Sequence, residues 1–188
     1  MYLYFTKDRY LKQLNIKILN VAKDELTDAM IIDGKSLELP SIHTGWHYNF
    51  DWHSRELPNA ATYVLVTEET PELIEGCLIF QMIDKKIPYM AFLEVAPHNR
   101  NDPKRYEYVA GCLIAFAFKQ SVIKGKGYYK AQLFFDVPQE SKEKKQKLIS
   151  VYRKKYQALL MGESRLVIID EAGYNLIEKY LNRKFKDQ

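Results

Sequence analysis

Three strand-like runs of apolar residues follow one another closely in the middle of the sequence. Residues 61–67, 76–83 and 89–96 are rich in β-branched and aromatic side chains, which is typical of strands. The acidic connector of residues 68–75 joins the first two runs, and this spacing indicates a hairpin. Pro97 ends the third run. The pattern therefore predicts a sheet that contains hairpin-connected strands.

The hydrophobic period changes after Pro97. Between residues 104 and 124, Val109, Leu113 and Phe116 share one helical face, and further apolar residues widen it, which predicts a largely buried helix. The glycines at 125 and 127 would end this helix. The elements expected beyond it are a strand at 129–137, a helix at 142–161, a strand at 165–170 and a helix at 171–182.

The first sixty residues carry weaker signals. Residues 15–22 alternate between apolar and polar side chains and are expected to form a strand. Residues 24–60, rich in His, Trp, Pro and Asn, are expected to form short helices and loops. The predicted fold class is α/β (α+β), with hairpins in the first half and crossover helices in the second.

Composition places this chain among ordinary globular proteins. Its 188 residues are 47% hydrophobic and 28% charged, which suits a single domain with a full core. Cys77 and Cys112 lie inside apolar runs, which favours buried reduced thiols in a cytoplasmic protein over a disulfide or a metal pair. No signal peptide is recognised, and the longest apolar run, residues 109–118, is too short to span a bilayer, so no membrane partner is expected.

The segment Leu-Glu-Val-Ala-Pro-His-Asn-Arg at 93–100, followed by Arg-Tyr-Glu-Tyr-Val-Ala-Gly at 105–111, resembles the GNAT acetyltransferase superfamily. In that family a strand ending in Val-x-Pro leads into a loop with the pattern Gln/Arg-x-x-Gly-x-Gly/Ala, and the loop opens a helix. The resemblance covers residue 61 to the end. It implies a mixed, mostly antiparallel central sheet flanked by helices, in one domain of residues 1–188 whose first 60 residues form the variable acceptor side.

The resemblance also implies that acetyl-CoA is the co-substrate. The start of a helix offers unpaired N–H groups and a positive dipole end, which suit a pyrophosphate. Lys104 and Arg105 are expected at this start, where they would add charge-assisted bonds. Tyr108 stands where the family has Gly, so its ring must point away from the ligand. The expected coenzyme-binding residues are Leu93, Val95, Lys104, Arg105, Tyr108, Val109, Ala110 and Gly111.

Two residues are candidates for the chemistry. Glu94, within a strand, could accept a proton from an incoming amine directly or through water, or it could lie on the solvated face or pair with Lys or Arg. Tyr152 matches the position of the family's general acid, which would protonate the leaving thiolate. The alternative for Tyr152 is a core position on its helix, and Tyr156 is a second candidate for the acid.

The segment 43–53 contains three His residues and one Asp. A metal site is not predicted, because Gly45 interrupts the helical spacing and no distant Cys/His cluster completes a tetrahedral site. Trp46, Phe50 and Trp52 are expected to cover the acceptor pocket, with a plain core role as the alternative. His98 follows a strand end, where it could also contact the acceptor, although an idle exposed loop position is the simpler interpretation.

Three functional hypotheses remain at this stage. The first is an N-acetyltransferase acting on an unidentified primary amine. The second is a degenerate module that binds acyl-CoA or a macromolecular partner without turnover. The third, which is weaker, is a basic adaptor that contacts nucleic acid through residues 142–155, a stretch that is more simply a solvated helix face. The net charge of +4 suits an anionic ligand but does not by itself indicate a nucleic acid.

Overall fold

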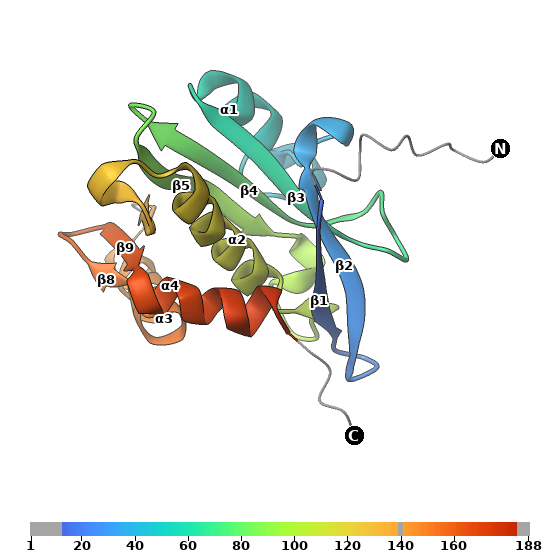
Figure 1. Cartoon of the computed structure of the whole chain (residues 1–188). Helices are drawn as coiled ribbons and strands as arrows, with labels where there is room; N and C mark the ends of the chain where they lie inside the picture. The colour runs from blue at the N-terminus through green and yellow to red at the C-terminus, as the bar shows by residue number, and fades with distance from the viewer. Residues whose placement is uncertain (1–12, 139–140, 184–188) are drawn as a thin grey trace.

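The computed structural model describes residues 13–138 and 141–183, and these form one mixed sheet covered by helices on both faces (Figure 1). The strand order in the described part of the chain is β6-β1-β2-β3-β4-β5-β7-β9-β8. All neighbours pair antiparallel except β5 and β7, which are parallel. The mixed, mostly antiparallel sheet predicted from the sequence is therefore confirmed.

The first five long strands form a continuous antiparallel meander. Their bounds are β1 Leu14–Asn20, β2 Glu25–Asp33, β3 Ala60–Thr67, β4 Ile74–Ile83 and β5 Ile87–Val95. The prediction of irregular structure from residue 24 was wrong, because β2 is a nine-residue strand. Its first half is polar, which hides the alternation, and only Ala29 and Ile31 are buried. Pairing with β1 on one side and β3 on the other stabilises it as a strand.

The second half of the chain contains one parallel crossover. Helix α2, Val109–Lys124, connects β5 to β7, Gln132–Asp136. Helix α3, Lys142–Tyr156, then leads to the short β8, Leu159–Leu160, and to β9, Arg165–Ile169, which pairs antiparallel with β7. The chain continues through α4, Asp170–Leu176, into a π-helical turn, Ile177–Leu181.

Helix α2 begins five residues later than predicted. Tyr106–Glu107 forms a two-residue strand, β6, that pairs with Asn20 and Leu19 of β1, and Tyr108 caps the helix. This long-range pairing takes the backbone away from the helical path that the local sequence favours. Among the described residues, no helix is both long and apolar enough to cross a bilayer.

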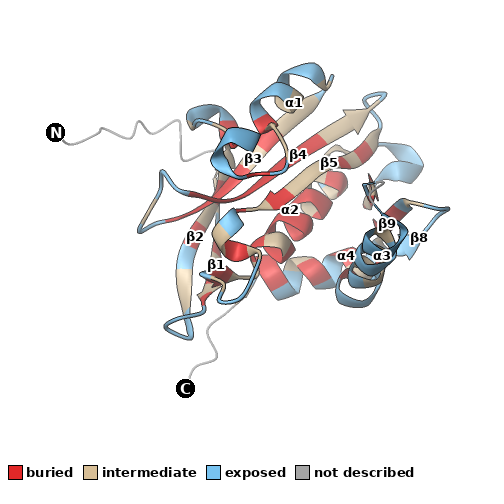
Figure 2. Cartoon of the chain, turned by 180° about the vertical axis from the view of Figure 1, so that it is seen from behind, coloured by how far each residue is buried: buried red, intermediate tan, exposed pale blue. Residues whose placement is uncertain are grey.

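Helix α3 is also shorter than predicted. Gln157, with φ 55°, adopts a left-handed conformation that ends the helix. Tyr156 is buried and Tyr152 is half-buried, whereas Leu148 and Val151 of the predicted apolar stripe are 37% and 41% exposed. Figure 2, which views the molecule from behind and colours it by burial, shows α2 mostly buried, whereas α3 and α1, Phe50–Glu56, are exposed over much of their surface.

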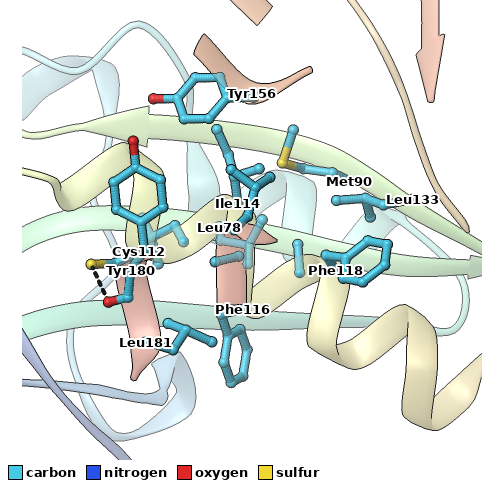
Figure 3. Packing of buried hydrophobic residues seen from close by; sticks show 14 of the residues in the cluster. Leu78, Met90, Cys112, Ile114, Phe116, Phe118, Leu133, Tyr156, Tyr180 and Leu181 are labelled. Carbon is cyan, nitrogen blue, oxygen red and sulfur yellow. Dashed lines mark hydrogen bonds between the residues drawn. The ribbon is translucent and has the colours of Figure 1, made fainter. Parts of the chain in front are cut away.

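Two clusters of buried side chains form the core on either side of the sheet. The larger cluster lies around α2 and includes Cys112, whose thiol is 3.5 Å from the Tyr180 carbonyl oxygen (Figure 3). The smaller cluster, which includes Phe50 and Cys77, packs α1 and the segment before it against β3 and β4. Both cysteines are free and buried, as predicted. Burial raises the pKa of the Cys112 thiol to about 12, which makes it a poor nucleophile.

Candidate active site

The parallel strands β5 and β7 stay paired at a single register position, Tyr89 opposite Phe134. Strand β5 continues to Val95, but its ladder with β7 does not extend along residues 91–95. The backbone of β5 therefore has an edge with no strand beside it, at the carboxyl end of a parallel strand pair. Open α/β sheets bind ligands at such ends, outside the last paired residues.

A polar clamp joins the two strands near the point where the ladder stops. The Tyr89 hydroxyl donates to Asp136 Oδ2 at 2.7 Å, and Arg165 of β9 donates to the same oxygen at 3.0 Å. Burial acts to raise the pKa of Asp136, but the hydrogen bonds from Arg165 and Tyr89 outweigh it and lower this pKa. Burial and the bond to Asp136 raise the pKa of Tyr89 to about 12. The clamp is therefore ionised at Asp136 and neutral at Tyr89 near pH 7.

The start of α2 follows the end of β5 through residues 96–108. Tyr108, the N-cap, has φ 74° and ψ −6°, a left-handed conformation that favours glycine, and its side chain does not cap the helix. The Tyr108 ring packs against Tyr180, with 6.3 Å between centroids, and under the Arg183 guanidinium at 3.7 Å. Because the first backbone N–H groups of a helix have no partner within it, those of residues 109–111 are available to an anion.

The predicted coenzyme residues fall into two groups. Val109 and Gly111 face the core, where Val109 lies against Gly76, and the absence of a Cβ at Gly111 makes room for the Tyr180 ring. Leu93 and Val95 pack against the larger core cluster, and Ala110 is half-buried. The side chains of this group shape the helix start and the strand edge. Because these five side chains are apolar, only their backbone groups can form hydrogen bonds with a ligand.

Lys104 and Arg105 do not lie in the first turn of the helix, contrary to the prediction. Both precede β6, so β6 and the N-cap separate them from residue 109. Arg105 is exposed, and its guanidinium lies 5.2 Å from the Tyr106 ring centroid. The Arg105 backbone N–H donates to the His98 carbonyl oxygen, and the Arg105 carbonyl oxygen accepts the Val21 N–H, so this loop is held in place. The two cations therefore lie on a fixed loop that precedes the helix in sequence, and they are not part of the helix.

Glu94 is one of the most highly bonded side chains in the structure. It is 7% exposed and points to the face of the sheet that carries segment 45–48. Its Oε1 accepts the His47 backbone N–H at 2.8 Å and is 2.8 Å from His47 Nδ1, and it also contacts the Arg100 guanidinium. Its Oε2 accepts the Tyr48 N–H at 3.2 Å. Of the alternatives left open for Glu94, pairing with an arginine is the one found.

Tyr152, on α3, packs against the larger core cluster. Its ring lies 4.7 Å from that of Phe135 on β7. Burial, with a smaller contribution from nearby Tyr48, raises the pKa of Tyr152 to about 12. Tyr48 in turn packs on Phe92 of β5, with 5.0 Å between centroids. Tyr48 therefore packs on the strand that carries Glu94, whereas the Tyr156 ring lies between those of Tyr152 and Tyr180, at 5.8 Å and 6.3 Å from their centroids.

The three predicted acceptor aromatics have different environments. Trp46 and Phe50 are 8% and 0% exposed and belong to the smaller core cluster, with their rings 5.8 Å apart. They fix the segment that carries His47. Trp52 is 53% exposed, and its ring contacts that of the neighbouring His53, with 4.9 Å between centroids. Of the three rings, that of Trp52 is the one an external molecule can reach.

His98 is not an idle loop residue. Its Nε2 lies 2.6 Å from Oε2 of the fully buried Glu75, and the Asn99 amide donates to the same oxygen at 2.7 Å. Asn99 also accepts the Tyr106 N–H at 2.9 Å. This cluster ties the loop after β5 to the start of β4 and to β6. It supports the path that leads the chain to the α2 N-terminus.

Sequence reasoning missed the group formed by His47 and Arg100 around Glu94. The contact between His47 and Glu94 joins residues 47 positions apart, so no local pattern reveals it. The only available signal was the rule that a strand carboxylate turned inward needs a partner. Among the described residues, no group of three or more His, Cys, Asp or Glu side chains is arranged to hold a metal ion.

A separate groove of about 1180 Å³ runs beside α3 and the β8–β9 hairpin. The cations Lys142, Lys145, Arg153 and Lys154 line it together with Glu163. Ile149 and Leu159 are among its apolar lining residues. The groove uses the outer face of α3, and neither Tyr152 nor Glu94 lines it. It is the basic helix surface recognised in the sequence, and it is distinct from the site between β5 and β7.

Comparison with known proteins finds similarity only among solved structures. No protein-family model matches the sequence, and no curated protein matches it. A GNAT family acetyltransferase from Elizabethkingia anophelis with acetyl-CoA bound is 12% identical, at a TM-score of 0.49, over 76% of this chain and 98% of that one. AtaTR bound with AcCoA is 15% identical, at a TM-score of 0.47, over 88% of this chain and 98% of that one.

A third similar structure is that of mutant forms of the spermidine/spermine N-acetyltransferase SpeG from Vibrio cholerae. It is 12% identical, at a TM-score of 0.45, over 67% of this chain and 73% of that one. The solved structures to which the chain is similar thus include members of the family that its sequence resembles. Because these identities and TM-scores are low, the assignment of function depends on the geometry of the site.

Proposed function

We propose that this chain is a divergent GNAT-type enzyme that transfers an acetyl group from acetyl-CoA to a primary amine. The observation that carries the proposal is the parallel pair β5 and β7, which separates after one register position next to the uncapped start of α2. An extended ligand with amide groups can pair with the open edge of β5, as an added strand would. A pyrophosphate attached to it can bind the N–H groups of residues 109–111. Coenzyme A has both features.

The proposal assigns the chemistry to Tyr152 of α3 and to Glu94 of β5. In the proposed reaction the amine nitrogen attacks the thioester carbonyl, a C–N bond forms and the C–S bond breaks. Tyr152, whose pKa of about 12 keeps it protonated at neutral pH, gives its proton to the departing thiolate. Glu94 serves the amine side, where the nitrogen must lose a proton. Because both Glu94 oxygens are already bonded, an intervening group takes the proton and Glu94 supports that group.

The remaining predicted residues take supporting roles in the proposal. Lys104 and Arg105, on the loop before β6, attract the phosphates electrostatically. Leu93 and Val95 present their backbone to the pantetheine arm. Trp52 and His98 border the acceptor side, with Trp52 as the exposed ring.

A second candidate function is favoured by one observation, the tyrosine at position 108. Its left-handed backbone and its ring under Arg183 place a bulky side chain at the residue that caps the proposed phosphate site. A module that binds acyl-CoA without turnover would tolerate a looser site than an enzyme. The two functions differ in whether free thiol is released.

The test combines binding with turnover. Acetyl-CoA binding is measured by titration calorimetry, and thiol release is then followed with polyamines, aminoglycosides, amino acids and peptide N-termini. The proposal expects binding and release with at least one class of amine. Binding without release from any amine would favour the non-catalytic module, and the absence of binding would contradict both functions.

A further inference from the structure

We propose that His47 is the catalytic base of this site and that Glu94 is the positioning residue that orients it. This inference rests on the proposed acetyl transfer and names the group that takes the proton from the amine. It starts from the contact between His47 Nδ1 and Glu94 Oε1 at 2.8 Å, between a residue before α1 and one on β5.

The bond to Glu94 sets the tautomer of the histidine. An ionised carboxylate only accepts hydrogen bonds, so Nδ1 must carry the proton that lies between the two groups. In the neutral ring, Nε2 then holds the lone pair. No hydrogen bond to Nε2 is found within the described residues. The arrangement therefore presents a proton acceptor on the side of the ring away from Glu94.

Exposure separates the two residues. The Glu94 side chain is 7% exposed, whereas the His47 side chain is 72% exposed. A carboxylate has about four lone-pair positions, and Glu94 uses them for two bonds from His47, one from Tyr48 and one from Arg100. An incoming amine can therefore meet His47 without displacing any of these bonds, but it cannot reach Glu94 without breaking one.

The backbone around His47 is held in place. A short 3₁₀ turn, Ile42–Thr44, ends at Gly45, whose φ of 83° turns the chain toward β5. The Arg100 guanidinium bonds the Gly45 carbonyl at 3.2 Å as well as Glu94, and it lies 5.8 Å from the ring centroid of the buried Trp46. A base must be held near one geometry to act. These contacts fix the backbone and Nδ1 while leaving the far edge of the ring exposed.

The charged and titratable groups around His47 come from four elements. Glu94 comes from β5, and Arg100, which contacts Glu94, follows the turn Pro97–Asn99. The neighbouring Tyr48 packs against His53 of α1 and acts electrostatically on Tyr152 of α3. His53 stacks on Phe92 at 4.0 Å, and burial lowers its pKa. His53 is therefore a second histidine near this face that could affect a pH profile, and it is the matched control.

The proton balance of the proposed step is complete. As the amine nitrogen bonds to the acetyl carbon, Nε2 of His47 takes one of its protons and the ring becomes an imidazolium. The negative charge of Glu94 stabilises that cation through the Nδ1–H bond. The electron pair of the broken C–S bond goes to sulfur, which Tyr152 protonates. No oxidant, reductant or metal is required.

The experiment compares His47→Gln with His53→Gln in the full chain. For an amine that the wild type acetylates, kcat is measured by thiol release as a function of pH, and acetyl-CoA affinity is measured by calorimetry. We expect His47→Gln to lower kcat by about 10²- to 10⁴-fold, to abolish the acid limb of the pH profile and to leave acetyl-CoA affinity unchanged. His53→Gln should keep the acid limb and most of the activity.

The outcomes separate this inference from the proposed function. If His47→Gln keeps the wild-type acid limb and turns over within threefold of the wild type, His47 is not the base, although the enzyme assignment stands. A purely structural role would lower the melting temperature and reduce the rate equally at every pH, which also overturns the proposal. If the wild type releases no thiol with any amine, both the transfer reaction and this role for His47 are refuted.

Glu94→Gln tests the positioning role. Glutamine keeps an oxygen that can accept the Nδ1–H bond but removes the charge that stabilises the imidazolium. We expect a lower kcat with a shifted acid limb, while the ¹⁵N spectrum of the His47 ring still shows the proton on Nδ1. An unchanged pH profile in a folded Glu94→Gln protein would contradict the role of Glu94.

Discussion

Replacing Tyr108 by alanine and by glycine should give two variants whose order of stability reveals the backbone at the start of α2. Tyr108 has φ 74°, in the left-handed region, at the residue that caps the helix. Both substitutions remove the ring from Tyr180 and Arg183. They differ only in whether a Cβ remains at a position where it is strained.

The expected difference follows from two opposing contributions. A Cβ in the left-handed region costs roughly 1–2 kcal/mol of folded-state stability. Glycine loses about 0.4–1 kcal/mol relative to alanine through the entropy of the unfolded chain. Tyr108→Gly should therefore be more stable than Tyr108→Ala by about 1 kcal/mol, or roughly 2–4 °C in melting temperature for a chain of this size.

Both variants should be less stable than the wild type. The Tyr108 side chain is half-buried, and burial of about 100 Å² of aromatic surface contributes roughly 2.5 kcal/mol. The contact with Arg183 contributes about 0.5–1 kcal/mol more. The loss of these two contributions exceeds the strain that glycine relieves. The free energy of unfolding should therefore be highest for the wild type, lower for the glycine variant and lowest for the alanine variant.

Urea denaturation followed by far-ultraviolet circular dichroism measures these free energies. Tyr129, in the 3₁₀ turn Gly127–Tyr129, provides the control, because its backbone is right-handed and alanine should there be more stable than glycine. Equal stability at position 108, or greater stability of the alanine variant, would refute the left-handed start of α2.

Three further predictions concern the site. Arg105→Glu should weaken the binding of coenzyme A but not that of acetylated pantetheine, because Arg105 is exposed near the proposed phosphate site. Lys126→Glu, at the other end of α2, is the control and should change neither affinity, and calorimetry measures both. Tyr152→Phe should lower the rate of thiol release by about 10²- to 10⁴-fold and leave acetyl-CoA affinity unchanged. Tyr156→Phe, the control, should release thiol at nearly the wild-type rate, and equal rate losses in the two variants would contradict the role of Tyr152. Asp136→Asn should destabilise the fold at neutral pH, because the pKa of Asp136 is lowered in the folded state and the resulting stability is present above the unfolded pKa of about 4. This stability is lost as the pH falls through the folded-state pKa, so the difference in melting temperature between variant and wild type should become smaller in acid. A difference that stays the same at all pH values would contradict the role of the clamp.

The parts of the fold that were predictable are those with local periodicity. Strands β3, β4 and β5 and the body of α2 follow from apolar runs whose period matches their geometry. Strand β2 was not predictable in the same way, because its first half is polar and its identity depends on two neighbours in the sheet. The late start of α2 has the same origin, since β6 exists only through its pairing with β1.

The candidate site was predictable in its residues more than in its contacts. Glu94 and Tyr152 come from a resemblance that gives positions along the chain, but burial and partners depend on how distant segments meet. His47 lies 47 residues from Glu94, and Arg100, which also contacts Glu94, comes from the loop after β5. The position of Lys104 and Arg105 was wrong because it assumed a helix that begins before β6.

The most direct test of the central claim is the melting temperature of the wild-type chain with and without acetyl-CoA. A ligand that binds only the folded state at a hundredfold excess over its dissociation constant stabilises it by about 2.7 kcal/mol. For a chain of this size that corresponds to a rise of roughly 5–11 °C. Acetylated pantetheine, which lacks the pyrophosphate, should give a clearly smaller rise at the same concentration. No change in melting temperature at millimolar acetyl-CoA would contradict the assignment of the β5–β7 edge and the α2 start as an acyl-CoA site.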